Sequence, residues 1–275
     1  MPTGIRLSSE IKNQVVNYYL SSPMSISECA KTNGLSSPTV IKILDEYNIE
    51  RYKKARIFNP ELDEHFFEVI DTEAKAYYLG LLITDGNVFV SNDRSNRQAS
   101  ISLTQSEADS YILYRFLKEV KSNCSIGHDG RGVCQAAIRS DVMAQDLSRY
   151  GVAPRKTYFA YLPIVESNYM RHLIRGILDG DGCIISSMQY NRKHKHCISF
   201  CGTHILMDDL ATYLSLNLNV QTPKVYDYTD RMLSEIKWQN INDILTIGNY
   251  LYNDAEIFLE RKYNAFLDFK NHYCL

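Results

Sequence analysis

Two aspartates stand at the ends of two similar apolar segments, in an arrangement that could support metal-dependent chemistry. The segment YLGLLITDG covers residues 78–86, and IRGILDGDG covers residues 174–182. At a constant offset of 96 residues, Asp85 in the first segment matches Asp181 in the second. If the segments are helices packed side by side, the two carboxylates repel each other and face the negative ends of two helix dipoles. A divalent cation such as Mg²⁺ would compensate this charge, and carboxylates that hold Mg²⁺ commonly serve phosphodiester hydrolysis.

The same segments carry small residues at helical spacing. Gly80 and Thr84 are four residues apart, as are Gly176 and Gly180, so each helix presents a stripe of small side chains. Such stripes let two helix backbones approach closely, which would bring the two aspartates together. For either segment alone, a core helix that ends at a glycine cap is the simpler explanation. The repetition is what favours the paired arrangement.

Further patterns repeat beyond the two aspartates. The matching pairs are strands 99–105 and 196–202, helices 107–120 and 205–218, strands 132–139 and 235–239, and helices 141–150 and 241–252. Each copy reads helix, strand, strand, helix, strand, strand, helix, which predicts a pseudo-two-fold α+β domain rather than a solenoid. We place the first copy at residues 73–165 and the second at residues 166–275.

The first 50 residues have the pattern of a small all-α module with three helices. Residues 1–60 hold eight Lys and Arg against five Asp and Glu, so their local balance is +3. A glycine-containing turn before the third helix is typical of a helix-turn-helix, and it makes Ser37, Thr39 and Lys42 candidate DNA contacts. Three-helix modules that never touch DNA are the alternative. The acidic residues that follow predict a linker over residues 51–72.

The composition of the 275 residues limits the classes of function. The net charge is −2, so positive charge for a nucleic-acid partner has to be local. Seven scattered cysteines without a C-x-x-C pair favour a reducing compartment. The longest apolar run, residues 77–83, is far shorter than the roughly 20 residues that cross a bilayer. We therefore expect a cytoplasmic protein, in a bacterial or phage-infected cell, without a membrane partner.

The paired motifs resemble those of the monomeric, two-motif LAGLIDADG homing endonucleases, and the resemblance extends from about Ala74 to the carboxyl terminus. GVAPRKTYFAYLP at residues 151–163 and AEIFLERKYNAF at residues 255–266 resemble the stretches that follow each repeat in that family. The resemblance implies two antiparallel sheets that form a saddle over the major groove of double-stranded DNA. It also implies a monomer with Mg²⁺ held between the ends of the motif helices.

The resemblance also assigns roles to individual residues. It makes Asp85 and Asp181 the metal-binding acids, each completed by the preceding backbone carbonyl, which belongs to Thr84 or Gly180. It makes Lys156 and Lys262 the basic residues of the active centre. One departure is visible, because Ile83 stands where the second copy has Asp179. That position is not a metal ligand in the family.

Local basic clusters on and between the strands are candidate groove contacts. They are Asn92, Arg94, Arg97 and Gln98 in the first copy, and Arg192, Lys193, Lys195 and Lys237 in the second. The alternative is that these side chains guard exposed strand edges.

One more cluster, His194, His196, Cys197 and Cys201, contains residues that bind zinc. In an extended strand the two histidines share one face and the two cysteines share the other, so a single tetrahedral site would require the strand to break. Buried or edge cysteines and solvent-facing histidines are the alternative.

These observations predict a site-specific endonuclease that hydrolyses double-stranded DNA with divalent metal ions held by the two aspartates. The rival function is a non-cleaving DNA-binding regulator, or an RNA splicing maturase, on the same scaffold. The presence of both acids favours the enzyme, because a pure binder gains nothing from two carboxylates that repel each other.

Overall fold

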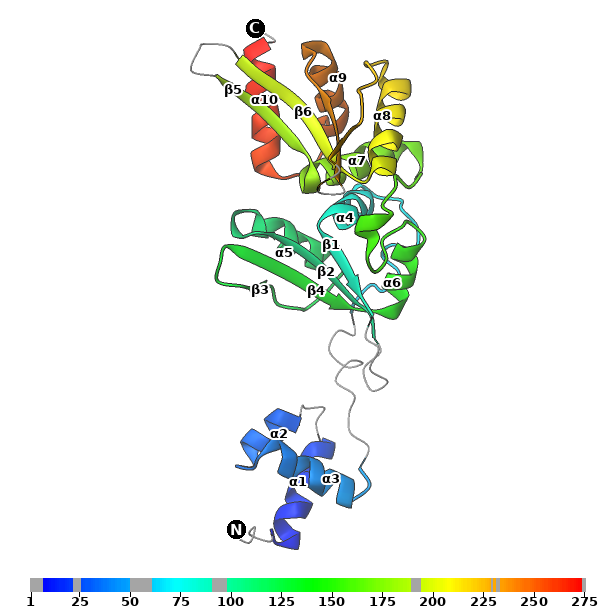
Figure 1. Cartoon of the computed structure of the whole chain (residues 1–275). Helices are drawn as coiled ribbons and strands as arrows, with labels where there is room; N and C mark the ends of the chain where they lie inside the picture. Colours follow the sequence, from blue (N-terminus) through cyan, green and yellow to red (C-terminus); the bar gives the residue numbers. More distant parts are fainter. Residues whose placement is uncertain are drawn as a thin grey trace. The chain divides into compact units, whose positions relative to one another are not determined.

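The computed structural model describes residues 7–21, 26–49, 61–90, 98–188, 194–228, 230 and 233–273. The chain divides into two units, residues 1–60 and residues 61–275. Each unit has its own hydrophobic core. Figure 1 shows the elements of both units in sequence colours.

The first unit consists of three helices. They are α1 (Ser9–Ser21), α2 (Ile26–Thr32) and α3 (Ser37–Glu46). Helix α3 begins where the Ser36 hydroxyl accepts a hydrogen bond from the Thr39 N–H at 3.3 Å, and Pro38 fits the first turn because no N–H is needed there. Val15, Cys29 and Leu44, one from each helix, are fully buried against one another. The predicted three-helix module is therefore present, and its use in DNA binding stays a prediction.

The second unit contains two successive copies of one arrangement. The first copy comprises α4 (Glu73–Thr84), β1 (Gly86–Phe89), β2 (Ser100–Ser106), η1 (Glu107–Asp109), α5 (Ser110–Glu119), β3 (Gly127–His128), β4 (Val133–Arg139), α6 (Asp141–Ser148) and η2 (Lys156–Tyr158). The second comprises α7 (Ser167–Asp181), β5 (Cys183–Met188), β6 (His194–Gly202), α8 (His204–Leu218), β7 (Tyr226–Tyr228), β8 (Leu233–Trp238), α9 (Ile241–Tyr252) and α10 (Glu260–Tyr273).

The two sheets have the same strand order. The first sheet runs β1-β2-β4-β3 and the second runs β5-β6-β8-β7, and every pairing is antiparallel. Each sheet starts directly after a motif helix, with Gly86 opposite Leu103 in one copy and Cys183 opposite Ser199 in the other. The predicted α+β fold with a pseudo-two-fold repeat is thereby confirmed, and Figure 1 shows one sheet on each side of the α4–α7 pair.

Helices α4 and α7 pack at unusually short range because glycines face each other. A methyl group added at Gly80 would overlap the carbonyl oxygen of Leu173, and one added at Gly176 would overlap that of Tyr77. A methyl group at Gly180 would overlap the side chain of Thr84. The predicted stripes of small residues are therefore the contact surface between the two helices.

The boundary between the units differs from the predicted linker over residues 51–72. Residues 61–72 belong to the second unit, and Phe66, Phe67 and Ile70 are buried in its core. The burial of these apolar side chains, rather than the acidic composition, determines where the segment lies.

No helix within the described residues is both long and apolar enough to cross a bilayer.

We expect Gly80→Ala to destabilise the second unit, because its new methyl group meets backbone atoms of α7 that cannot rotate away. Overpacking of this kind costs about 1–3 kcal/mol, which exceeds the gain of about 1 kcal/mol in helix propensity. Urea unfolding followed by the fluorescence of Trp238, the single tryptophan, measures the change in this unit alone. Gly127→Ala is the matched control, because a methyl group there lies 3.8 Å from its nearest neighbour. Equal stability of both variants would contradict the close helix packing.

Candidate active site

The predicted acids stand at the carboxyl-terminal ends of the packed helices. Asp85 caps α4, with its N–H donating to the Leu81 carbonyl oxygen at 2.9 Å, and Asp181 is the last residue of α7. Each is followed at once by a glycine and the first strand of its sheet. The close contact between α4 and α7 therefore brings the two carboxylates near the same point.

The environment of the acids disfavours their charged form. Burial raises the pKa of Asp85 to about 6, and the negative charge of Asp181 adds to this rise. Gln105 on β2 opposes it by donating from Nε2 to Asp85 Oδ2 at 2.6 Å. Burial likewise raises the pKa of Asp181, against the positive charges of Lys156 and Lys262. The two acids thus lie in one partly desolvated, electrostatically coupled site.

The predicted lysines lie in the same place, and both are nearly fully buried. Lys156 donates from Nζ to the Thr84 carbonyl oxygen at 2.9 Å. Lys262 donates to the carbonyl oxygens of Leu178 and Asp179, both at 2.6 Å, and reaches that of Gly180 at 3.3 Å. Each ammonium therefore binds carbonyl groups at the end of the motif helix in its own copy, where the helix dipole is negative.

Burial also shifts the pKa values of the lysines. It lowers the pKa of Lys262 to about 8, although the charge of Asp179 opposes the change. Burial lowers the pKa of Lys156 as well, against the charges of Asp181 and Asp85. Amines that are desolvated beside carboxylates in this way are typical of active centres.

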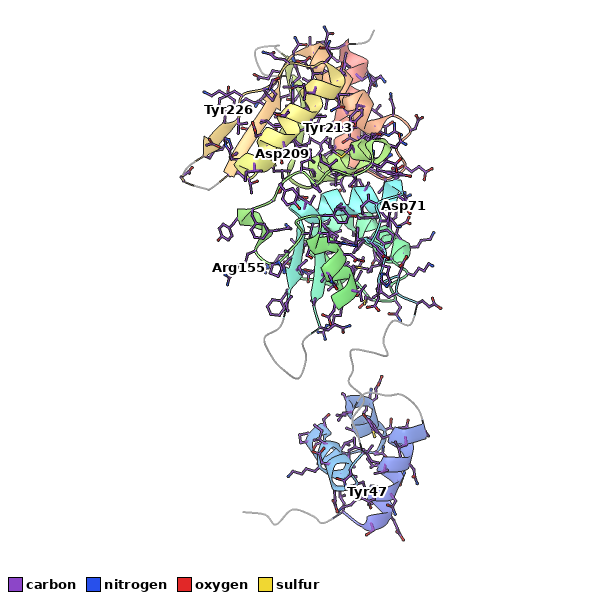
Figure 2. The ribbon with its side chains drawn as sticks, turned by 90° about the vertical axis from the view of Figure 1, so that its right-hand side faces the viewer. Tyr47, Asp71, Arg155, Asp209, Tyr213 and Tyr226 are labelled. Atoms are coloured by element: carbon purple, nitrogen blue, oxygen red, sulfur yellow. The ribbon has the colours of Figure 1, made fainter. Side chains whose placement is uncertain are left out.

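Different elements support the two lysines. Lys262 lies in the first turn of α10, next to Arg261, whose Nε donates to Asp109 Oδ2 at 2.8 Å. Lys156 begins the three-residue helix η2, after Arg155 in the left-handed backbone conformation with φ +64°. Figure 2 shows Arg155 at the surface of the unit.

Several of the predicted DNA contacts fall outside the part of the chain that the structure describes. These are Asn92, Arg94, Arg97, Arg192 and Lys193. Gln98 is half-buried just before β2, with its side-chain oxygen buried and without a partner among the described residues. Lys195 is exposed on β6. Lys237 on β8 lies 5.3 Å from the ring of Tyr226, which Figure 2 shows on the edge strand β7.

The open face of the first sheet offers candidate DNA contacts that are not among the predicted residues. Burial alternates along β4, so Gln135 and Arg139 point away from the core while Ala136 points into it. Ser102 and Thr104 on β2 pair with this strand, and Gln135 Nε2 donates to the Thr104 hydroxyl at 3.1 Å. Apolar and polar side chains partly alternate with a period of two in residues 133–139, and this pattern could have indicated which residues face away from the core.

In the first unit, the predicted contacts lie near the start of α3. Lys42 is exposed, and Ser37 and Thr39 are half-buried. The Thr39 hydroxyl is hydrogen-bonded to that of Ser36 at 2.7 Å, so it takes part in the helix cap.

The described residues hold no cluster of three or more His, Cys, Asp or Glu side chains arranged to bind a metal. In the cluster considered for zinc, His196 shares a hydrogen bond of 3.0 Å with the Tyr273 hydroxyl, and Cys197 is buried on the opposite face of β6. The donors that converge at the helix ends are instead two carboxylates and the carbonyl oxygens of Thr84 and Gly180. Such hard oxygen donors fit Mg²⁺, which keeps several waters and needs only one or two carboxylates.

Comparison with known proteins assigns the fold. Meganuclease I-SmaMI, solved bound to uncleaveable DNA, matches with a TM-score of 0.54 and 13% identity, over 73% of this chain and 90% of that chain. LAGLIDADG meganuclease I-AabMI, solved bound to uncleaved DNA, matches with a TM-score of 0.52 and 13% identity over the same shares. No protein-family model matches the sequence, and no curated protein does. The chain therefore has the fold of the LAGLIDADG meganucleases.

We expect Asp85→Asn to stabilise the second unit at neutral pH when divalent ions are absent. The folded-state pKa of about 6 lies above the ordinary 3.8, so the folded protein binds a proton more readily than the unfolded chain between these values. Raising the pH from about 4 to about 6 therefore lowers the free energy of unfolding of the wild type. The asparagine variant does not titrate here, so its stability does not fall for this reason.

Urea unfolding at a series of pH values tests this prediction. The quantity compared is the difference in the free energy of unfolding between variant and wild type. Asp129→Asn is a control of opposite sign, because backbone N–H donors, first that of Arg131, hold the pKa of Asp129 below its ordinary value. Its carboxylate stabilises the fold above that value, and this contribution is lost as the pH falls. A pH-independent difference for Asp85→Asn would show that its carboxyl group titrates normally.

Proposed function

We propose that the protein is a site-specific endonuclease that cuts double-stranded DNA with the help of divalent metal ions. The observation that carries the proposal is the convergence of Asp85, Asp181, Lys156 and Lys262 at the ends of two packed helices. Carboxylates can hold the metal ions that assist phosphodiester hydrolysis, and ammonium groups can stabilise the charge that develops on the phosphate. The fold shared with the meganucleases I-SmaMI and I-AabMI, which were solved with DNA, supports the same activity.

The acids and the carbonyl oxygens beside them would hold the metal. When bound, Mg²⁺ would supply positive charge next to the scissile phosphate and make water a better nucleophile. Gln105 fixes the orientation of the Asp85 carboxylate through its 2.6 Å hydrogen bond, leaving the other carboxylate oxygen free of that bond. This anchoring keeps the carboxylate in place before DNA arrives.

The lysines would act on charge that develops during cleavage. The Lys156 ammonium donates one hydrogen bond, to the Thr84 carbonyl oxygen, and its other hydrogens could bind a phosphate oxygen or a water. Lys262 would exchange its longest contact, to the Gly180 carbonyl oxygen at 3.3 Å, for such an acceptor. A preorganised donor of this kind stabilises the pentacovalent arrangement more than the ground state. Because the groups are buried, little solvent reorganisation accompanies the reaction.

The open faces of the two sheets would contact the grooves of the DNA, and a single chain would supply both halves of the site. The side chains there are mostly small and polar in the first copy, and Lys195 and Lys237 add positive charge in the second. Residues of α3 in the first unit would add contacts outside this region. This arrangement gives an overall acidic chain a local surface for a polyanion.

We expect Asp85→Asn and Asp181→Asn each to abolish double-strand cleavage while leaving DNA affinity near that of the wild type. The loss follows from the missing metal-binding charge, and affinity is retained because removing a carboxylate near phosphates does not weaken association. Purified protein with Mg²⁺ is tested on the DNA that flanks its own gene and on a randomised duplex library. Asp71→Asn is the matched control, since Asp71 lies at the surface, paired with Lys75 at 2.7 Å (Figure 2).

A second measurement separates metal binding from cleavage. Mg²⁺ should raise the thermal midpoint of the wild type, because it binds the folded state only, and should leave the Asp85→Asn/Asp181→Asn double variant unchanged. Cleavage that persists in excess EDTA would exclude this mechanism. Tight DNA binding without any cleavage would instead favour the non-cleaving regulator.

We expect Lys42→Ala to weaken binding to a mixed-sequence duplex and to flatten its salt dependence. Removing one phosphate contact changes the slope of log K against log salt by about 0.9 on B-DNA. Fluorescence anisotropy over a range of salt concentrations measures both quantities. Lys12→Ala is the matched control, because the Lys12 ammonium is already paired with Glu46 at 2.7 Å. Unchanged affinity and slope in Lys42→Ala would remove α3 from the DNA interface.

A further inference from the structure

The carboxylate of Asp179, two residues before the predicted metal ligand of α7, is fully buried and bound on several sides. Its Oδ2 accepts from the Tyr77 hydroxyl at 2.8 Å and from the Leu259 N–H at 2.7 Å. Its Oδ1 accepts from the Tyr252 hydroxyl at 3.4 Å. A buried carboxylate with this many donors is held in one orientation.

These hydrogen bonds fix the start of the helix that carries Lys262. Leu259 directly precedes α10, and Lys262 lies in its first turn, with Nζ donating to the backbone oxygen of Asp179 at 2.6 Å. Asp179 thus binds the α10 segment twice, through its carboxylate and through its carbonyl group. Asp179 therefore positions both the start of α10 and the ammonium group of Lys262.

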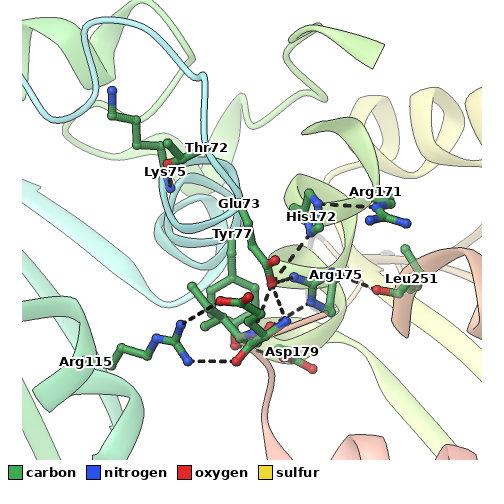
Figure 3. A network of polar contacts seen from close by, with 12 residues as sticks. Thr72, Glu73, Lys75, Tyr77, Arg115, Arg171, His172, Arg175, Asp179 and Leu251 are labelled. Carbon is green, nitrogen blue, oxygen red and sulfur yellow. Dashed lines mark hydrogen bonds and ion pairs between the residues drawn. The ribbon is translucent and has the colours of Figure 1, made fainter. Parts of the chain in front are cut away.

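The segment before α10 is fixed by the same network. Arg175 on α7 donates from Nε to the Ile257 carbonyl oxygen at 2.8 Å, and Glu73 on α4 accepts from the Ile257 N–H at 2.9 Å. Arg175 and Glu73 are themselves paired at 2.6 Å. Figure 3 shows Glu73, Arg175, Asp179 and Tyr77 gathered in this network. The network joins both motif helices to the segment before α10.

The pseudo-symmetry-related positions of the first copy are apolar. At the offset of 96 residues, Ile83 matches Asp179 and Leu173 matches Tyr77, and both are buried. A hydrocarbon side chain accepts no hydrogen bond, so Ile83 cannot bind the backbone before Lys156 as Asp179 binds Leu259. Lys156 starts a three-residue 3₁₀ helix, whereas α10 has 14 residues.

We propose that Asp179 is a positioning residue for Lys262, and that the apolar pair Ile83 and Leu173 leaves Lys156 less firmly placed. The two halves of the active centre then work at unequal rates, and the DNA strand whose cleavage depends on Lys262 is cut first. This inference rests on the proposed endonuclease function.

Strand-resolved kinetics test the unequal halves. Each strand of a cleavable duplex is labelled separately under single-turnover conditions, and Lys156→Met and Lys262→Met identify the strand that each lysine serves. The wild type should cut the Lys262-dependent strand first, so that a nicked intermediate accumulates. Asp179→Asn should slow this strand about 10- to 100-fold, as loss of a supporting contact to an active-site group does, and leave the other strand unchanged. The other strand is an internal control for folding, since a damaged fold slows both.

A second readout needs no DNA. Amine acetylation of the full chain, followed by mass spectrometry, reports how often each lysine is accessible. Asp179→Asn should raise acetylation of Lys262 several-fold and leave Lys156 unchanged, because only the α10 start opens more often. Asp146→Asn, which removes another buried carboxylate at 8% exposure, is the matched control. The double variant Tyr77→Leu/Asp179→Ile copies the apolar pair of the first copy and should make the two lysines equally accessible.

The outcomes separate the two proposals. Equal slowing of both strands, or unchanged acetylation of Lys262, would overturn the positioning role of Asp179. Simultaneous cutting of both strands by the wild type would overturn the unequal halves. If the wild type cuts no DNA, the endonuclease function fails, whereas the acetylation result still decides whether Asp179 positions Lys262.

Discussion

The close approach of two helix backbones is the constraint on which the rest of the second unit depends. Gly80 of α4 lies against the backbone of Leu173, and Gly176 of α7 lies against that of Tyr77, in spaces that no methyl group could share. This contact sets the distance between the carboxyl ends of the helices, where the acids lie. It also fixes the two sheets, since only one residue separates α4 from β1 and α7 from β5. This single packing contact therefore sets the positions of both the acids and the two sheets.

The electrostatic consequence is a site in which opposing charges balance before any metal binds. Burial raises the pKa values of Asp85 and Asp181, and the charge of Asp181 adds to the rise at Asp85. Lys156 and Lys262 offset this by binding the carbonyl oxygens at the ends of α4 and α7. The lysines thus offset the negative charge of the acids and of the helix ends.

The sequence predicted the fold well because its signals were local and repeated. The motif helices and the strands follow from periodicity and glycine spacing, the offset of 96 residues aligned the two acids, and the family resemblance pointed to the two lysines. The linker prediction failed over residues 61–72 because acidic composition outweighed three apolar residues, whose burial depends on a distant core. The hydrogen bond from Gln105 to Asp85 was not predictable either, because it depends on how far β2 extends past the end of α4. The roles of the acids and lysines stay predictions that their placement supports.

A single chain that contains both halves of a pseudo-symmetric site can differ between the two halves. Asp179 with Tyr77, and Ile83 with Leu173, are buried pairs that differ in this way. A carboxylate at a buried position needs donors, because an unsatisfied charge there is costly. Asp179 has such a donor in Tyr77 from the opposite helix. At the related positions the acid and its donor are both replaced, by Ile83 and Leu173, so no polar group is left without a partner. Each pair is therefore matched in polarity, as packing across a helix interface requires, and the proposed consequence is weaker support for Lys156. The proposed asymmetry would thus have its origin in the core between α4 and α7 and not in the acids and lysines at the helix ends, which both copies contain.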